Sequence, residues 1–500
     1  MPVPRWLQYG PSFAKNTFGR SARARRGLAA CAVVLAAGGL VLFRAPQGGV
    51  AQGLALPDHP KPVSTEVARG SNSVAFSGPG AHGTLGLSHT KVLSGARQAI
   101  YAELQIRADK DDGRAVHAPL SLVVVLDTSG SMTGDKIEQA KDSVIKLIRQ
   151  MDDADELSVV RYSTDAATVV PMGRVSDVRA KAIARVNELE ANGGTNIPRG
   201  LSEGLEQLRE TGQGRVRRVV LVSDGLDSTR TQAERLATDS FERGIVVSSL
   251  GIGLDFDESY MSSVASRGHG NFGFVNDASS LAKFLTRELD ETAKTVVENA
   301  TVRITLPRGV TFQRASGADV RTDAGKRGSG ELELKLGSLF AGDERRVILE
   351  LESNAVQGDA TFEAHAAWDR IGGAHADIDV PSLSVVATAD RDEVEKGRDP
   401  SVLASAVSVT ASRRQMEAAT AYSRGDVRTA DALVEENLRA LRGAAAVAPA
   451  PMATALRSQV GTYEKAQKGF HTYDSSSAPA KALSKSIVQD DSANIARKAY

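Results

Sequence analysis

The stretch Leu122-Val123-Val124-Val125-Leu126-Asp127-Thr128-Ser129-Gly130-Ser131 decides the fold. Its first half is an apolar run without polar alternation, which is typical of a strand buried on both faces, as in a parallel sheet. A carboxylate and two hydroxyls follow at once, on Asp127, Ser129 and Ser131. Sheets of α/β proteins bind ligands outside the carboxyl ends of their strands, and hard oxygen donors suit a divalent cation. We therefore predict a parallel strand that ends in a cation-binding turn.

The segment from 120 to 290 alternates between strand and helix patterns. After the first strand, Ile137, Ala140, Val144, Ile148 and Met151 recur at helical spacing. Further strands are predicted at 157–162, 168–170, 219–222, 245–250 and 271–275, and helices at 177–189, 198–208, 231–243, 258–266 and 281–289. This alternation predicts right-handed crossovers and an α/β domain over 119–291 with a doubly wound, mostly parallel sheet.

The segments on both sides of this domain have β patterns. In 64–118, apolar Ile100, Ala102, Leu104 and Ile106 alternate with polar residues, and 292–390 contains several such runs. Short strands with Gly-rich turns are typical of a β-sandwich. Two arrangements remain open at this point. The α/β domain is inserted into one sandwich built from both segments, or the two segments form separate small β elements.

The C-terminal part has a helical pattern. Residues 391–442 predict a helical hairpin, with a turn at Gly425-Asp426. For 443–500 we expect an Ala/Pro linker over 443–451, a helix over 453–468 and a mobile Ser-rich tail.

The N-terminal part indicates export. Residues 1–26 carry six basic residues and no acid, and 27–43 are uncharged and apolar. Residues 1–51 therefore resemble a bacterial signal peptide or signal anchor, followed by a linker over 52–63. Either form places the rest of the chain outside the cytoplasm, in the periplasm or cell envelope, and the anchor would attach it to the inner membrane through 27–43.

Composition excludes several classes of function. Lys+Arg and Asp+Glu both total 61, so bulk positive charge for nucleic-acid binding is absent. The single cysteine, Cys31, excludes an intrachain disulfide and a cysteine-based zinc site, and the eight histidines form no HExxH motif.

Two more loops join the first turn in the predicted sheet. Gly193-Gly194-Thr195-Asn196 opens a helix, and Val222-Ser223-Asp224-Gly225 ends a buried strand. With Asp127, Ser129 and Ser131, these loops match the metal-ion-dependent adhesion site of the von Willebrand factor type A (VWA) domain at all five positions, so 119–291 resembles that family. The resemblance implies that Ser129, Ser131 and often Thr195 bind the cation directly, whereas Asp127 and Asp224 act partly through water.

The chemistry of these donors indicates binding and argues against catalysis. Neutral hydroxyls leave the ion electrophilic, and carboxylates one shell out orient them. Mg²⁺ is the expected ion, with Mn²⁺ or Ca²⁺ as alternatives, and its open position suits an Asp or Glu of a partner protein. No histidine, lysine or further acid is placed by the sequence to act as a base. The simplest alternative is a sheet-edge turn whose Ser and Asp cap a helix.

The predicted function is a non-enzymatic, metal-dependent binding protein of the adhesion or scaffold type. Its order of β, VWA and β segments is similar to VWA proteins related to the calcium-activated chloride channel regulators. The alternatives are an envelope structural or assembly factor whose metal only stabilises the domain, and a metal-dependent hydrolase. His269 is predicted to lie in a surface turn, and Asp255, Asp257 and Glu258 to interact with a helix N-terminus.

Overall fold

The computed structural model describes residues 72–110, 119–209, 211, 215–224, 229–254, 256–275, 278–322, 330–354, 356 and 358–496. The expected leader, its apolar segment 27–43, the linker 52–63 and Asp255 lie outside these residues. Within the described part of the chain, no helix is long and apolar enough to cross a membrane.

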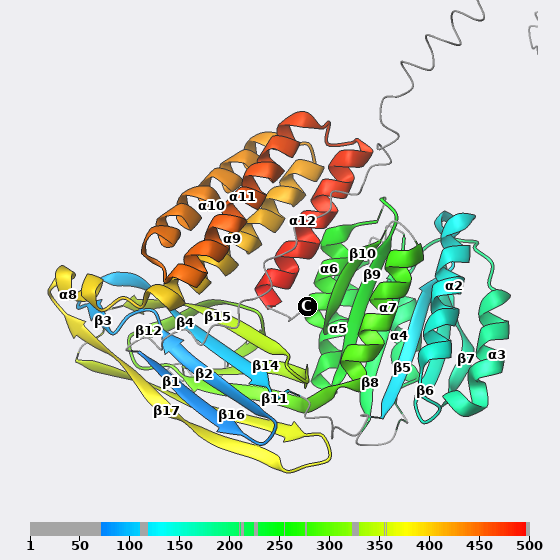
Figure 1. The fold of residues 1–500 in the computed structure, drawn as a ribbon, viewed down its shortest axis with the longest axis horizontal. Coiled ribbons are helices and arrows are strands. Elements are labelled where there is room, and N and C mark those ends of the chain that lie inside the picture. The colour runs from blue at the N-terminus through cyan, green and yellow to red at the C-terminus, as the bar shows by residue number, and fades with distance from the viewer. Residues whose placement is uncertain are drawn as a thin grey trace, which may run out of the picture. The chain divides into compact units, whose positions relative to one another are not determined.

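The α/β domain runs from the strand β5 to the helix α7 (Figure 1). Its elements are, in chain order, β5 (Leu120–Asp127), the short 3₁₀ turn η1 (Gly130–Met132), α2 (Asp135–Gln150), β6 (Glu156–Tyr162), β7 (Ala166–Arg174), α3 (Val175–Asn187), α4 (Ile197–Glu206), β8 (Val216–Ser223), α5 (Arg230–Glu242), β9 (Ile245–Ile252), α6 (Glu258–Arg267), β10 (His269–Val275) and α7 (Ala278–Ala293). The predicted strand and helix order is confirmed.

The sheet has the order β10-β9-β8-β5-β6-β7. All neighbours are parallel except β6 and β7, which pair antiparallel at one edge. The chain therefore winds outward in one direction from β5 to β7, returns to β8 beside β5, and winds outward in the other direction. This confirms the predicted doubly wound, mostly parallel sheet, and it makes the β5–β8 boundary the point where the strand order reverses.

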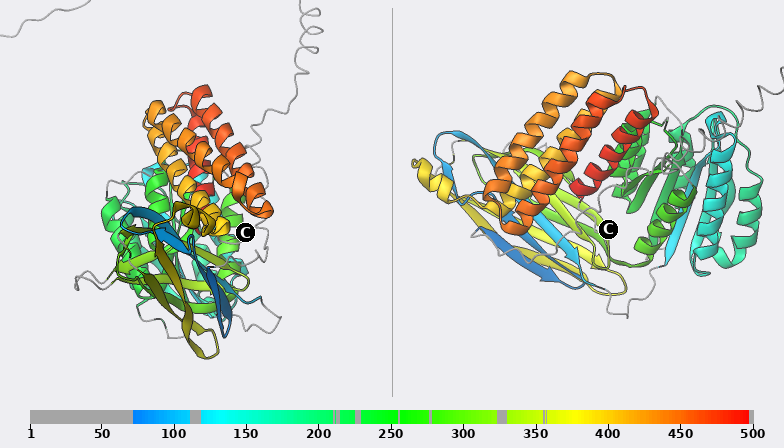
Figure 2. Two further views of the ribbon diagram at one scale, coloured as in Figure 1. Left: turned by 90° about the vertical axis from the view of Figure 1, so that its left-hand side faces the viewer. Right: turned by 45° about the horizontal axis from the view of Figure 1, so that its top comes forward.

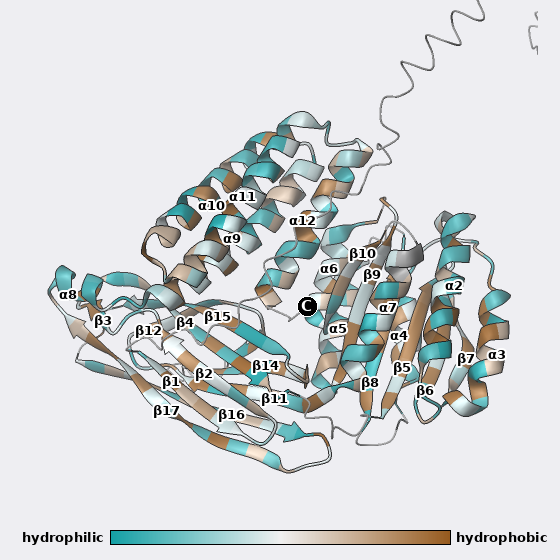
Figure 3. Ribbon diagram, viewed as in Figure 1, coloured by the Kyte–Doolittle hydropathy of each residue, from teal (hydrophilic) through white to brown (hydrophobic). Residues whose placement is uncertain are grey.

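The strand β5 is buried along its whole length because successive side chains enter two different cores. Leu122, Val124 and Leu126 pack in one core with residues of α2, α3 and α7. Val123 and Val125 pack in the other core, with residues of α4, α5 and α6. Figure 3 shows the apolar strands of this sheet beside helices whose remaining surface is largely hydrophilic. Helices thus cover both faces, which explains the unbroken apolar run in the sequence.

Two further sheets form a β-sandwich (Figures 1 and 2). One has the order β1 (Ser73–Gly78), β2 (Ala81–Leu87), β4 (Arg97–Ala108), β15 (Glu344–Asn354) and β12 (Val310–Ser316). The other has the order β13 (Asp319–Thr322), β14 (Glu331–Phe340), β11 (Thr295–Thr305), β16 (Asp359–Arg370), β17 (His375–Thr388) and β3 (Lys91–Leu93). The side chains between them form one common hydrophobic core.

Both sheets combine strands from before and after the α/β domain. In the first sheet β4 pairs with β15 from Arg107–Glu344 to Arg97–Asn354. In the second sheet β3 pairs in parallel with the end of β17. Trp368 of β16, almost fully buried, also donates its indole N–H to the carbonyl of Pro79 at 2.8 Å. The α/β domain is therefore inserted into a single sandwich, and the alternative of two separate β elements is wrong.

The C-terminal part is a bundle of helices rather than a hairpin with a tail. After the short α8 (Arg391–Lys396) come α9 (Pro400–Ser423), α10 (Val427–Val447), α11 (Ala450–Thr472) and α12 (Ala478–Ala496). The predicted hairpin is confirmed as α9 and α10, which meet at Gly425 (φ 83°). The last four helices share one core.

Two expectations for residues 443–500 are wrong. The segment expected to be a linker continues α10 to Val447 and begins α11 at Ala450, because Ala favours helix and Pro is compatible with the first helical turn. The Ser-rich segment expected to be mobile forms α12, whose Ala480, Ile487 and Val488 are buried in the bundle. The serine run 475–477 directly before the helix, and the polar residues within it, hide this sparse apolar stripe in the sequence.

The helix α12 also contacts the α/β domain. The Lys485 ammonium, which is buried, donates to the carbonyl of Phe256 at 2.7 Å and to the Glu258 carboxylate at 2.8 Å. It also lies 3.9 Å above the Phe256 ring. The Gln489 side chain accepts a hydrogen bond from the backbone N–H of Phe274, in the edge strand β10, at 3.1 Å. These contacts hold α12 against α6 and β10.

Leu104 provides a test of the shared sandwich core. It is 1% exposed on β4 and lies between Leu85 of β2 and Val347 of β15. Because Leu104→Ala leaves a cavity between strands from both segments, we expect it to lower the free energy of unfolding by roughly 2–5 kcal/mol in urea denaturation. Arg97→Ala, on an exposed side chain of the same strand, should change it by less than about 0.5 kcal/mol. Equal effects would contradict the shared core.

His89 predicts a pH dependence of stability. Burial, and to a lesser extent the charge of Arg398, lowers its pKa from 6.5 to about 4. Between these values the unfolded chain binds more protons than the folded chain, so stability falls as pH drops from 6.5 through 4. We expect a loss of roughly 3 kcal/mol from this residue. Urea unfolding at pH 7 and pH 4 should give a smaller difference for His89→Gln than for the wild type, and an unchanged difference would refute the assignment.

Candidate metal-binding site

Asp127 lies at the carboxyl end of β5 and is fully buried. Its Oδ1 accepts from the backbone N–H of Ser129 at 2.8 Å. Its Oδ2 accepts from the Ser223 hydroxyl at 2.7 Å and from the Tyr162 hydroxyl at 3.3 Å. These bonds fix the carboxylate and shape the turn that follows, so Asp127 is held in one orientation by the ends of β5, β6 and β8.

Three side-chain oxygens form a chain across the β5–β8 boundary. The hydroxyls of Ser129 and Ser131 lie 3.0 Å apart, and the Ser131 hydroxyl donates to Oδ1 of Asp224 at 2.7 Å. Asp224 directly follows β8, the parallel neighbour of β5. The structure therefore brings together four of the five predicted residues at the point where the strand order reverses, which is where open α/β sheets bind their ligands.

The loop that carries Thr195 is attached to the same turn by its backbone. The N–H of Gly130 donates to the carbonyl of Gly193 at 2.9 Å, and the N–H of Asn192 donates to the carbonyl of Thr128 at 2.7 Å. Thr195 is half-buried two residues before α4, whose first turn is capped by Asn196. All three predicted loops thus converge.

Two glycines bring α4 close to the sheet. A Cβ on Gly200 would lie 2.5 Å from the Tyr162 ring, and one on Gly204 would lie 2.5 Å from a methyl group of Val125. Real Cβ atoms do not approach so closely, so larger residues would push α4 outward. The sequence 197–205 therefore sets the distance between the Thr195 loop and the end of β5.

The site is electrostatically unfavourable for its own carboxylates. Burial raises the pKa of Asp127, hydrogen bonds from Ser129 and Ser223 oppose this, and the charge of Asp224 raises it further. Burial also raises the pKa of Tyr162, so its hydroxyl keeps the proton that it donates to Asp127. Two acids held together in a buried place are typical of a site that gains from a cation.

Sequence reasoning missed three residues of this site. Ser223 and Tyr162 bind Asp127, and Lys136, from the first turn of α2, forms an ion pair with Oδ2 of Asp224. In the sequence, lysine was considered only as a possible base, and Lys136 was not placed at the site. The sequence did contain a signal for Lys136 at the site: it follows Ser131 by five residues, in a helix that begins at the site. The ammonium donates to a buried carboxylate, so it acts there as a cation and not as a base.

The donor set fits a small divalent ion. In an octahedral Mg²⁺ site, ligands about 2.1 Å from the ion lie about 3.0 Å from their neighbours. The Ser129 and Ser131 hydroxyl oxygens lie 3.0 Å apart, which matches that value, and Asp224 accepts a hydrogen bond from the Ser131 hydroxyl at 2.7 Å and so orients it. Within the described residues, no cluster of three His, Cys, Asp or Glu side chains is arranged to hold a metal.

The other candidates have structural roles. The prediction that His269 lies in a surface turn is wrong, because it begins the strand β10. Its ring stacks on Phe241 at 3.6 Å, and its Nε2 lies 3.2 Å from a carboxylate oxygen of Asp319 in the sandwich. Asp257 caps α6 by accepting from the N–H of Tyr260 at 3.0 Å, as expected for a helix N-terminus.

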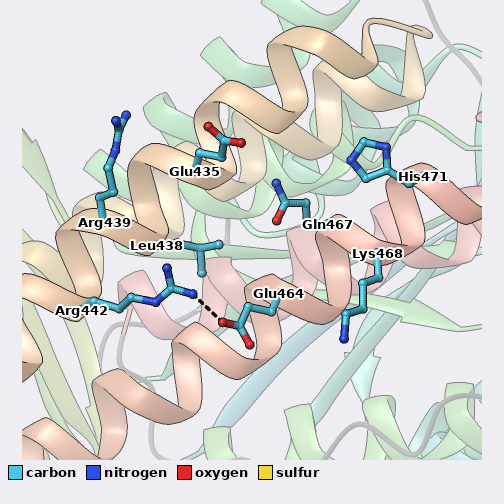
Figure 4. A pocket seen from close by; sticks show the side chains of 8 residues that line it. All are labelled: Glu435, Leu438, Arg439, Arg442, Glu464, Gln467, Lys468 and His471. Atoms are coloured by element: carbon cyan, nitrogen blue, oxygen red, sulfur yellow. Dashed lines mark hydrogen bonds and ion pairs between the residues drawn. The ribbon is translucent and has the colours of Figure 1, made fainter.

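A charged groove of about 690 Å³ lies between α10 and α11. Figure 4 shows its side chains, with Arg442 paired to Glu464 across the groove. Its lining has charges of both signs, from Glu435, Arg439, Arg442, Glu464, Lys468 and His471. It belongs to the helical bundle and shares no residue with the five-residue site.

Comparisons with known proteins agree with this geometry. Residues 121–287 match the model of the von Willebrand factor type A domain. The chain is 27% identical over 252 residues to the uncharacterized protein sll0103 of Synechocystis sp., which covers 49% of this chain and 59% of that protein. It is also 27% identical over 285 residues to the uncharacterized protein YfbK of Escherichia coli, which covers 52% and 49%. The chain thus spans about half to three fifths of these relatives.

Solved structures show the same fold. A von Willebrand factor type A structure from Catenulispora acidiphila superimposes with a TM-score of 0.62 at 18% identity and covers 86% of this chain and 98% of that one. The ArnB paralog VWA2 from Sulfolobus acidocaldarius gives 0.56 at 17% identity, with 82% and 98% covered. Residues 121–287 therefore form a VWA domain, which lies between the two halves of the sandwich in the chain.

Asp127→Asn tests the electrostatic cost at the site. Because the pKa of Asp127 is raised by folding, its contribution to stability falls as pH rises above the unfolded value. In EDTA at pH 7 we therefore expect Asp127→Asn to melt at or above the wild-type temperature in differential scanning calorimetry. Asp239→Asn, at an exposed position of α5, serves as the control and should change the melting temperature little. A clearly lower melting temperature for Asp127→Asn would show that its hydrogen bonds outweigh the cost of burial.

Proposed function

We propose that the VWA domain binds Mg²⁺ and through it holds an acidic side chain of a protein partner. Ser129, Ser131 and Thr195 supply hydroxyl ligands, and Asp127 and Asp224 orient them and hold water. The observation that carries this proposal is the pair of Ser129 and Ser131 hydroxyl oxygens at the spacing of neighbouring octahedral ligands, with Asp224 hydrogen-bonded to Ser131, at the point where the strand order reverses. Mn²⁺ and Ca²⁺ are the alternative ions.

The hydroxyl ligands favour a metal site that binds an anion. Three neutral hydroxyls do not reduce the charge of the ion, so an open position stays attractive to a carboxylate. Asp127 and Asp224 accept hydrogen bonds from hydroxyls, from a backbone N–H and from the Lys136 ammonium. A hydrolase needs a group that accepts a proton from water at the ion. The described contacts of the two acids favour binding over hydrolysis.

The setting of the domain supports a role in protein assembly outside the cytoplasm. The basic and apolar segments of 1–43 are typical of export or of an inner-membrane anchor. The sandwich and the helical bundle offer no chemistry of their own in this proposal. Both chain ends of the VWA domain connect to the sandwich, and the bundle contacts the domain through α12. The competing proposal, an envelope assembly factor, uses the same metal only to stabilise the domain.

Isothermal titration of the full chain with Mg²⁺ tests the metal site. We expect saturable binding by the wild type, a loss of at least about tenfold in affinity for Thr195→Ala, and no binding by Ser129→Ala/Ser131→Ala, because direct ligands are removed. Ser176→Ala, on α3, is the matched hydroxyl control and should bind as the wild type does. A wild type that binds neither Mg²⁺ nor Mn²⁺ would refute the proposal.

Capture of a partner separates the two roles of the metal. Wild-type protein should retain an envelope protein in Mg²⁺ and release it in EDTA at a temperature well below its own melting transition. Retention that is equal in Mg²⁺ and EDTA, together with a lower melting temperature in EDTA, would favour the assembly factor whose metal only stabilises the fold.

A further inference from the structure

The Lys136 side chain is held in place at the edge of the proposed metal site. It extends from the first turn of α2 to Asp224, whose side chain is 0% exposed, while the lysine side chain is 33% exposed. The loop after β9 passes beside it at Gly253, where a Cβ would lie in van der Waals contact with the Lys136 Cε, at 3.4 Å. The side chain therefore runs between α2 and this loop to the site.

The two oxygens of Asp224 have different partners. Oδ1 accepts from the Ser131 hydroxyl at 2.7 Å, and Oδ2 accepts from the Lys136 ammonium. Because the ammonium holds Oδ2, the carboxylate presents Oδ1 to Ser131, whose hydroxyl in turn contacts that of Ser129. Lys136 thus orients Asp224 without belonging to the set of oxygen ligands.

Lys136 also changes the charge of the site. The carboxylates of Asp127 and Asp224 together balance a divalent ion, so a loaded site made of these groups alone would be neutral. The ammonium adds a positive charge that the carboxylates do not balance. A like charge near the ion opposes its binding, and a positive loaded site favours an anionic ligand. Solvent at the partly exposed lysine moderates both effects.

We infer that Lys136 determines the specificity of the metal site. It lowers the affinity of the site for the cation and raises the affinity of the loaded site for a carboxylate. This inference rests on the proposed function. It predicts that removal of the charge moves the two affinities in opposite directions. A residue that only supports the fold would, when removed, weaken both.

The test uses Mn²⁺ and acetate with the full chain. Free Mn²⁺ measured by electron paramagnetic resonance gives the metal affinity. Water-proton relaxation of the Mn²⁺-loaded protein gives the acetate affinity, because acetate displaces bound water. Lys136→Gln keeps a hydrogen-bond donor for Asp224 but removes the charge. We expect it to bind Mn²⁺ about tenfold more tightly and acetate about tenfold more weakly than the wild type, the scale on which groups outside the ligand set act.

A control and a second variant make the result decisive. Lys146→Met removes the same charge from an exposed position about 15 Å further along α2 and should leave both affinities unchanged. Lys136→Met removes donor and charge together, so it should weaken acetate binding as Lys136→Gln does but tighten Mn²⁺ binding by less, because Asp224 also loses its hydrogen-bond donor. This second variant covers the case in which Lys136→Gln fails to fold. Weakening of both affinities, or no change in either, overturns the inference alone. A wild type that binds no Mn²⁺ overturns the proposed function and this inference with it.

Discussion

The parallel pairing of β5 with β8 is the constraint on which the rest of the site depends. Leu120–Leu126 and Val216–Val222 run side by side in register, so both strands end at the same edge of the sheet. Asp127 and Asp224 follow at those ends, and both are buried. Backbone hydrogen bonds between strands thus bring two carboxylates together against their mutual repulsion, and the apolar cores on both faces supply the free energy that keeps them there.

Much of this arrangement follows from local sequence pattern. The run 122–126 and the helix periodicities predict the doubly wound sheet, because burial on both faces excludes alternation. The five site residues are predictable because each stands directly after a strand or before a helix. Lys136 was missed because its role depends on the direction of a long side chain, and Tyr162 because a tyrosine in a strand is equally suited to the core. The helical structure of residues 478–496 depends on packing against other helices, which the composition of this segment does not reveal.

Two contacts between polar or charged side chains join the VWA domain to its neighbours. Lys485 is buried against Phe256 and Glu258, so α12 is held to the VWA domain by an ion pair and a carbonyl contact. His269 and Asp319 similarly join β10 to the sandwich. Such contacts are costly to leave without partners in a buried place, so they favour one mutual arrangement of the elements that they connect.

The split sandwich has a consequence for synthesis of the chain. Translation delivers β1, β2 and β4 first, but β15 begins only at Glu344, after the whole VWA domain has been made. The early strands therefore leave the ribosome with an apolar face that has no cover, whereas the VWA sheet has all of its strands within 120–275 and can fold as soon as they emerge. A chaperone that retains unfolded segments would act on residues 72–108 during this interval, and a chain released after residue 293 would carry a folded VWA domain next to an open sheet.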